Sequence, residues 1–115
     1  MKNSPSKLAE LTQQCGRLVD ELKRYGAERI ILFGSAASGD VDEYSDLDIV
    51  VVKPTTMGFV DRLADVVRKC PNALCADVII YTPEEFKNMQ ESENPFLEHV
   101  ISEGKLLYEK TKTTS

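Results

Sequence analysis

Two aspartates separated by a single residue are the first groups in this sequence whose types and spacing could do chemistry. Asp46 and Asp48 open an apolar run. Residues two apart on a β-strand point to the same face, so their carboxylates would project side by side. Asp77 stands at the start of another apolar run and would join them if the two strands are neighbours. Three carboxylates at one place suit Mg²⁺, a hard cation that prefers oxygen ligands and also holds substrate phosphates.

A lone Asp-x-Asp pair also has simpler explanations. The ordinary one is the end of a strand with both carboxylates in water, where their charge is not desolvated. The other is a calcium-binding loop, but the Gly and the later Glu of such a loop do not follow Asp48. Other motif elements are therefore needed to assign the aspartates to a functional site.

A glycine and a serine at the end of the preceding apolar strand provide such an element. Gly34 allows a sharp turn and the close approach of a ligand, and Ser35 adds a hydroxyl at the start of a helical turn. This combination suits a phosphate group. The spacing from Gly34 to Gly39 also matches a P-loop, but Asp40 and Val41 occupy its Lys and Ser/Thr positions, which excludes that class. The glycine fingerprint of a dinucleotide-binding fold is absent as well.

The motifs taken together resemble the nucleotidyltransferase fold of the DNA polymerase β superfamily. The short length and the C-terminal stretch resemble the minimal nucleotidyltransferase branch of that superfamily. The resemblance covers about residues 25 to 109. It rests on Gly34-Ser35, Gly39, Ser45-Asp46-Leu47-Asp48, Asp77 and the segment from Phe96 to Glu109.

The resemblance implies how a nucleotide would be held. Gly34 and Ser35, with Ser45, would bind a nucleoside triphosphate, ATP being the expected one. Many minimal members carry arginines in the stretch after Gly-Ser, where this chain has Ala36 and Ser38. Cationic help for the triphosphate is therefore absent from that stretch or comes from another part of the protein.

The resemblance also assigns roles to the three aspartates. Asp46 and Asp48 would bind two Mg²⁺ ions. Asp77 would bind one of them and take the proton of the attacking hydroxyl.

The acceptor of the nucleotide is the least determined part of the activity, because we expect a single domain, without a second one to hold the acceptor. Minimal nucleotidyltransferases often work with a small helical HEPN-domain protein as antitoxin and toxin, and some transfer AMP to a tyrosine of that toxin. The resemblance thus implies an enzyme acting as an antitoxin. Two alternatives stay open: an antitoxin that neutralises by contact with a vestigial site, and a small-molecule nucleotidyltransferase of the antibiotic-modifying type.

The length and composition limit the class of protein to which these residues belong. The 115-residue chain is 42% hydrophobic and 29% charged, a globular balance that predicts one nucleotidyltransferase domain over residues 1–115. A net charge of −5 argues against direct nucleic-acid binding and favours a basic partner. Without a long apolar segment we expect no membrane span and a cytoplasmic protein. The three cysteines and the single His99 lack the spacing of a zinc site.

Apolar spacing predicts an α/β (α+β) fold in which helices, mainly on one side, cover a small mixed sheet. The segment 58–69 is expected to be amphipathic, with Phe59, Val60, Leu63, Val66 and Val67 on its apolar face. A capping box at Thr82-Pro83-Glu84-Glu85 opens another helix. We expect helices at 6–25, 58–69, 83–89 and 95–103, a helical turn at 35–39, strands at 29–33, 46–52, 76–81 and 105–109, and a disordered tail at 110–115.

Overall fold

Residues 5–110 are the part of the chain that the computed structural model describes. Helices and strands alternate along it much as the sequence predicts, and the strand expected at 46–52 begins one residue later. The 3-10 helix η1 was not predicted, since no element was expected between the helix at 58–69 and the strand at 76–81. The elements are α1 (Pro5–Tyr25), β1 (Arg29–Phe33), α2 (Ser35–Ser38), β2 (Leu47–Val52), α3 (Phe59–Lys69), η1 (Pro71–Cys75), β3 (Ala76–Tyr81), α4 (Pro83–Glu91), α5 (Pro95–Glu103) and β4 (Lys105–Glu109).

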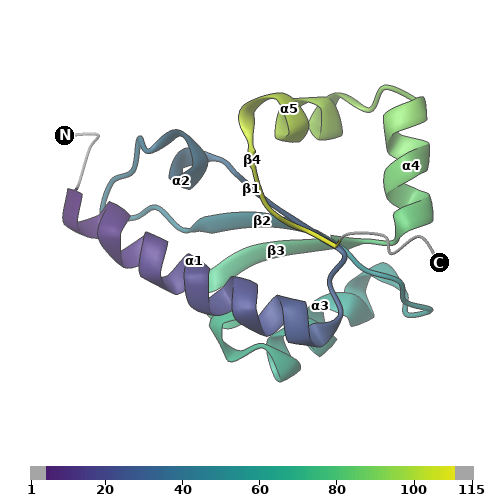
Figure 1. Ribbon diagram of the computed structural model, residues 1–115, viewed down its shortest axis with the longest axis horizontal. Coiled ribbons are helices and arrows are strands. Elements are labelled where there is room, and N and C mark those ends of the chain that lie inside the picture. The colour runs from purple at the N-terminus through teal and green to yellow at the C-terminus, as the bar shows by residue number, and fades with distance from the viewer. Residues whose placement is uncertain (1–4, 111–115) are drawn as a thin grey trace.

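The four strands form one mixed sheet in the order β3-β2-β1-β4 (Figure 1). β2 and β3 run parallel, whereas β1 is antiparallel to both of its neighbours, β2 and β4. The amino ends of β2 and β3 therefore meet the carboxyl end of β1 at one edge of the sheet. This edge receives the Gly34-Ser35 turn and all three aspartates.

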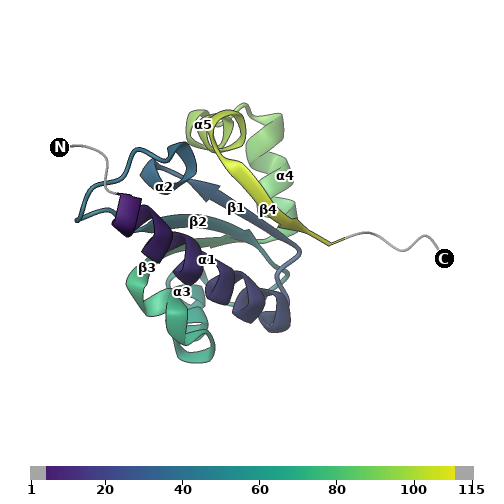
Figure 2. The same cartoon turned by 60° about the vertical axis from the view of Figure 1, so that its left-hand side comes forward.

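Apolar side chains cover both faces of the sheet, but unequally. The larger core lies on the face covered by α1, α2 and α3, where Leu18 and Leu22 of α1 are fully buried. The smaller core lies on the opposite face under α4 and α5 and includes Phe86 and Leu97. Figure 2 shows α1 in front of the sheet and the two short helices behind it. The expectation that helices lie mainly on one side is thus confirmed for the longest helices, while two shorter ones cover part of the other face.

The buried face of α3 differs from the one predicted. Arg62, Asp65 and Val66 are its buried residues. Val66 apart, the residues of the predicted apolar face are exposed: Phe59, Val60, Leu63 and Val67. The two charged side chains are buried because each meets polar partners, Arg62 on α4 and β3 and Asp65 on Tyr25 and Arg68.

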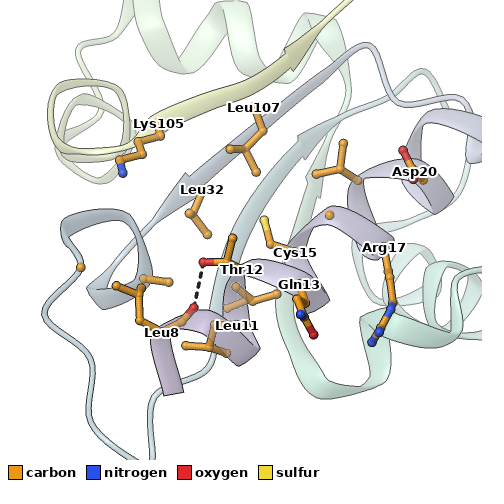
Figure 3. Close-up of a pocket in the computed structure, with 15 residues that line it drawn as sticks. Leu8, Leu11, Thr12, Gln13, Cys15, Arg17, Asp20, Leu32, Lys105 and Leu107 are labelled. Carbon is orange, nitrogen blue, oxygen red and sulfur yellow. Dashed lines mark hydrogen bonds between the residues drawn. The ribbon is translucent and has the colours of Figure 1, made fainter. Parts of the chain in front are cut away.

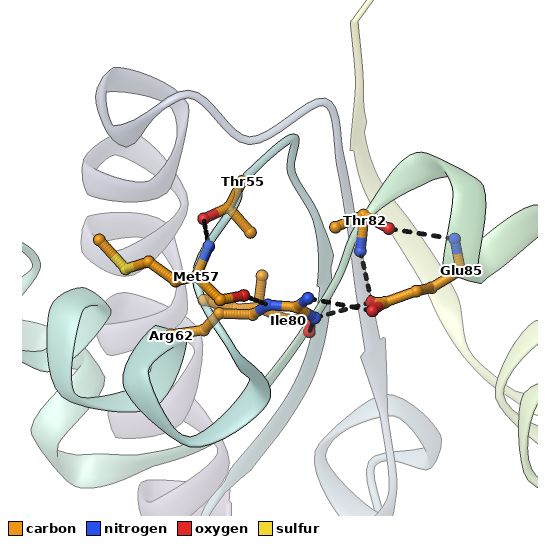
Figure 4. Close-up of polar contacts among 6 residues, drawn as sticks. All are labelled: Thr55, Met57, Arg62, Ile80, Thr82 and Glu85. Carbon is orange, nitrogen blue, oxygen red and sulfur yellow. Dashed lines mark hydrogen bonds and ion pairs between the residues drawn. The ribbon is translucent and has the colours of Figure 1, made fainter.

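Arg62 joins α3 to the end of β3 and the start of α4 (Figure 4). Its Nη1 and Nη2 donate to both carboxylate oxygens of Glu85 at 2.7 and 3.0 Å. Nη1 also donates to Ile80 O at 3.0 Å, and Nε donates to Met57 O at 2.9 Å. Glu85 in turn accepts from Thr82 N at 2.9 Å, which completes the predicted capping box. We call this group the Arg62 clamp.

The C-terminal segment is held at its first residue. Lys110 N donates to Glu28 O at 2.8 Å, so this residue belongs to the fold. Residues 111–115 of the expected tail lie outside the described residues. Between residues 5 and 110 we find no helix of the length and apolar character that a bilayer crossing requires.

Candidate active site

Strand register brings two of the predicted aspartates together. Asp48 of β2 lies directly opposite Asp77 of β3 in the parallel pair, so both side chains project from the same face of the sheet. Asp46 precedes Asp48 by two residues and lies on the same side, just before β2 begins. This is the face covered by α4 and α5, because Val50 and Val52 of β2 pack into that smaller core.

The three carboxylates repel one another. Burial raises the pKa of the Asp48 carboxyl above its ordinary value. The charge of Asp77, a hydrogen bond between the Asp48 and Asp77 carboxyl groups and the charge of Asp46 raise that pKa further. A cation placed among these groups would reverse each of the charge effects.

Gly34 touches this cluster from the turn between β1 and α2. Its backbone has φ +74°, a conformation that side chains with a Cβ rarely adopt. A Cβ built there would lie 2.3 Å from Oδ2 of Asp48, so only glycine leaves room for the carboxylate. The close approach predicted for Gly34 is therefore made first by the protein's own aspartate.

The two serines expected at the site are placed differently. Ser35 begins α2, and its hydroxyl makes no hydrogen bond with another of the described residues. Ser45 is turned toward Asp42: its Oγ accepts from Asp42 N at 3.0 Å and donates to Asp42 Oδ1 at 3.3 Å. Ser35 thus keeps its hydroxyl available, whereas Ser45 shapes the turn that leads into Asp46.

An aromatic pair adjoins the aspartates and was not found by the sequence analysis. Phe33 lies opposite Asp48 in the β1–β2 pair. The Phe96 ring of α5 packs edge-on against the Phe33 ring, with 5.6 Å between centroids and 87° between planes. The available signal was the place of Phe33 directly before Gly34, but its partner on α5 is 63 residues away in the chain.

A groove of about 840 Å³ lies on the opposite face of the sheet, between α1, α2 and β4 (Figure 3). Its lining is mostly apolar and includes Leu8 and Leu11 of α1 and Leu107 of β4, with Lys105 at its edge. None of the three aspartates lines this groove. It is therefore separate from the carboxylate site.

No group of three or more His, Cys, Asp or Glu side chains within residues 5–110 is already arranged to hold a metal ion. The donor set at the site is nonetheless one of oxygen atoms only, from Asp46, Asp48 and Asp77. Carboxylate oxygens are the ligands that Mg²⁺ takes in proteins, usually one or two carboxylates together with substrate phosphates. The residues present thus fit a magnesium ion that arrives with its nucleotide.

Comparison with solved structures supports the fold assignment. A protein from Sulfolobus solfataricus described as a nucleotidyltransferase superposes with a TM-score of 0.65 and 21% identity, covering 96% of this chain and 90% of its own. A toxin–antitoxin solved with AMP-PNP superposes with a TM-score of 0.58 and 23% identity, covering 84% of this chain and 73% of its own. A mutant of the toxin–antitoxin MntA-HpeT superposes with a TM-score of 0.49 and 22% identity, covering 87% of this chain and 73% of its own.

In sequence, the chain matches a protein-family model but no individual curated protein. The family model described as "Polymerase beta, Nucleotidyltransferase" matches residues 17–113, which include both the Gly34-Ser35 turn and the three aspartates. The match spans most of the chain, and the chain therefore belongs to the polymerase β nucleotidyltransferase family.

Proposed function

We propose that this protein transfers AMP from ATP to a hydroxyl group of a partner protein in the cytoplasm, with Mg²⁺ as cofactor. The partner proposed is a HEPN-type toxin, which the transfer would inactivate, so the protein would act as an antitoxin. The single observation that carries the proposal is the pairing of Asp48 with Asp77 across β2 and β3, with Asp46 beside them and Gly34 packed against Asp48.

The aspartates would hold the metal, and the turn after β1 would hold the triphosphate. Asp46 and Asp48 are proposed to bind two Mg²⁺ ions, and Asp77 to bind one of them. When bound, Mg²⁺ would neutralise charge on the phosphates and polarise the phosphorus that is attacked. Gly34 lies directly beside Asp48, and Ser35 with its free hydroxyl follows it at the start of α2. Both are proposed to contact the triphosphate. The resemblance also assigns Ser45 to the nucleotide, but its hydroxyl is engaged by Asp42, so we propose for it only the support of Asp46.

The proposed reaction is an in-line displacement at the α-phosphorus of ATP. The oxygen of the acceptor hydroxyl forms the new bond to phosphorus, and the bond from phosphorus to the bridging oxygen breaks. Asp77 takes the hydroxyl proton, and pyrophosphate leaves with the bonding electrons. Asp77 suits this role because it is exposed, on the edge strand β3, whereas Asp48 is half-buried between two strands.

The acceptor is proposed to lie on a protein because η1, which leads into β3, presents an exposed apolar side chain at the aspartate end of the sheet. Leu74, on η1, is 72% exposed and precedes Asp77 by three residues. A partner covering Leu74 would bring its hydroxyl close to the proposed base. The likeness in fold to a toxin–antitoxin solved with AMP-PNP supports a toxin as that partner and ATP as the nucleotide.

A second candidate function is neutralisation of the toxin by contact alone. It is favoured by one observation: α2 carries no basic residue, with Ala36 and Ser38 where many minimal members have arginine. The proposed enzyme must then rely on the metal for most of the charge neutralisation of the triphosphate.

The test is transfer of label from α-³²P-ATP to the co-expressed partner, with Mg²⁺ and with EDTA. The parent protein should label the partner only with Mg²⁺, and Asp46→Asn/Asp48→Asn should not label it. Protection of cells from the toxin is measured in parallel, with Asp61→Asn on α3 as a control that removes one exposed carboxylate outside the site. If the double variant protects as well as the parent, contact neutralisation replaces the proposed enzymatic role. If it binds the partner but does not protect, the chemistry is the function.

A further inference from the structure

We propose that Phe33 and Phe96 form the surface on which the nucleobase of the bound nucleotide stacks. This inference rests on the proposed function, since it assigns one part of the same nucleotide site. Its starting point is the order of side chains across the sheet. Phe33, Asp48 and Asp77 occupy matching register positions on β1, β2 and β3, so they form one row on one face.

The row is polar on β3 and apolar on β1. Asp77 lies on β3, the outermost strand on that side of the sheet, where the proposed acceptor enters. Phe33 lies at the β1 end and is followed directly by Gly34 and Ser35, which are proposed to hold the triphosphate. The nucleotide therefore lies on the β1 side of Asp48, and its base has the aromatic pair as its nearest apolar surface.

The aromatic surface is both fixed and accessible. Asn94 caps α5 by accepting a hydrogen bond from Leu97 N at 3.1 Å, which sets the first turn that carries Phe96. At the other end of α5, a Cβ on Gly104 would lie 2.7 Å from Leu32 O, so the helix terminus packs directly on β1. Phe96 nevertheless remains 37% exposed, and its ring stands at 87° to that of Phe33. A flat base can stack on one ring while meeting the edge of the other.

A nucleobase is the chemical class that such a surface favours. Base–aromatic stacking needs only a π face, so this contact tolerates different bases and does not by itself select adenine. The pair would thus add affinity for the nucleoside part of the ligand without contacting its phosphates. Because the base and the phosphates would be bound by different residues, their contributions to affinity can be measured separately.

The experiment compares binding of MgATP with binding of magnesium tripolyphosphate, which has the same phosphates and no base. Both ligands are titrated calorimetrically into the parent protein and three variants: Phe96→Leu, Phe96→Tyr and Ile101→Ala. Phe96→Leu keeps an apolar side chain but removes the ring, and Phe96→Tyr keeps the ring. Ile101 is a matched control because it is exposed on the same helix.

Phe96→Leu should weaken MgATP binding by about tenfold, the order expected for one base–aromatic contact. Its affinity for tripolyphosphate should not change, and Phe96→Tyr and Ile101→Ala should bind both ligands as the parent does. Equal loss for both ligands, or no loss for MgATP, overturns the inference. An effect confined to the KM of the acceptor would assign the ring to the partner and overturn it too. If the parent protein binds neither ligand, the proposed function itself fails, and the inference falls with it.

Discussion

The two ends of strand β3 carry charged clusters of opposite design. At its start, Asp77 faces Asp48 and lies near Asp46, so three like charges share one place. At its end, the carbonyl of Ile80 accepts from Arg62, which also binds Glu85, so opposite charges and hydrogen bonds are matched.

The comparison indicates that the Arg62 clamp serves the fold, and it supports the proposal that the aspartate cluster serves a ligand. The Arg62 clamp satisfies its charges within the protein, and both pKa values move in the stabilising direction: the pKa of Glu85 is lowered by its hydrogen bond to Arg62, and the pKa of Arg62 is raised. At the aspartate cluster, burial and then the neighbouring carboxylates raise the pKa of Asp48, which disfavours its charged form. Folding alone gains nothing from such a cluster, which supports the proposal that it binds a cation.

The largest expected effect comes from removing one charge at the aspartate end. Asp48→Asn should lower the rate of nucleotide transfer about a thousandfold, since the metal supplies several kcal/mol of transition-state stabilisation. Its melting temperature without metal should not fall, because the change relieves repulsion. Transfer kinetics and thermal denaturation measure the two effects. A variant that keeps the parent's transfer rate would contradict the assignment of Asp48.

Removing one charge at the C-terminal end of β3, in the Arg62 clamp, should instead lower the stability of the fold. Arg62→Met should lower the free energy of unfolding by about 2–3 kcal/mol, because two backbone carbonyls and Glu85 lose their donor. Urea denaturation measures the loss. The matched control is Arg29→Met, whose half-exposed ion pair with Glu109 should contribute at most about 1 kcal/mol. Equal losses in the two variants would show that the clamp is no stronger than a surface ion pair.

Two glycines separate backbone strain from the position of Asp48. Gly34 and Gly39 both have positive φ, +74° and +84°, so Gly34→Ala and Gly39→Ala should each cost about 1–2 kcal/mol of stability. A Cβ at Gly34 would also displace the Asp48 carboxylate, whereas one at Gly39 meets no atom within 4 Å. Only Gly34→Ala should therefore reduce transfer, by about a hundredfold for a misplaced group. Equal transfer rates in the two variants would argue against the close contact.

The smallest expected effect is a difference in the pH dependence of stability. The folded-state pKa of Asp48 is raised, so its contribution is present below its unfolded pKa, near pH 4, and is lost as the pH rises through the folded value. The folded-state pKa of Glu85 is lowered, so its contribution is present above its unfolded pKa and is lost as the pH falls through the folded value.

Urea denaturation between about pH 3 and pH 7 would measure both contributions. Relative to the parent, Asp48→Asn should gain stability as the pH rises. Glu85→Gln, which can keep the capping box, should lose stability over the same rise. If stability depended on pH in the same way in the two variants, the two ends of β3 would not differ in their electrostatics as described.

The site and the clamp also differ in how far the sequence predicts them. Asp46, Asp48, Gly34 and Ser35 lie close together in the chain, and a period of two along a strand fixes which residues share a face. Local sequence was thus sufficient to nominate them. The capping box at Thr82 was likewise predicted, because all its atoms lie within one helical turn.

What the sequence by itself determined is the alternation of elements, the family and the residues of the proposed site, since all of these depend on short-range spacing. Only the tertiary structure decided that β3 lies beside β2, that Phe96 meets Phe33, and that α3 buries Arg62 while most of its predicted apolar face is exposed. Each of these depends on partners far apart in the chain. Arg62 shows the physical reason most clearly: its burial is favourable only because Glu85 and the carbonyl of Ile80 are brought to it by folding.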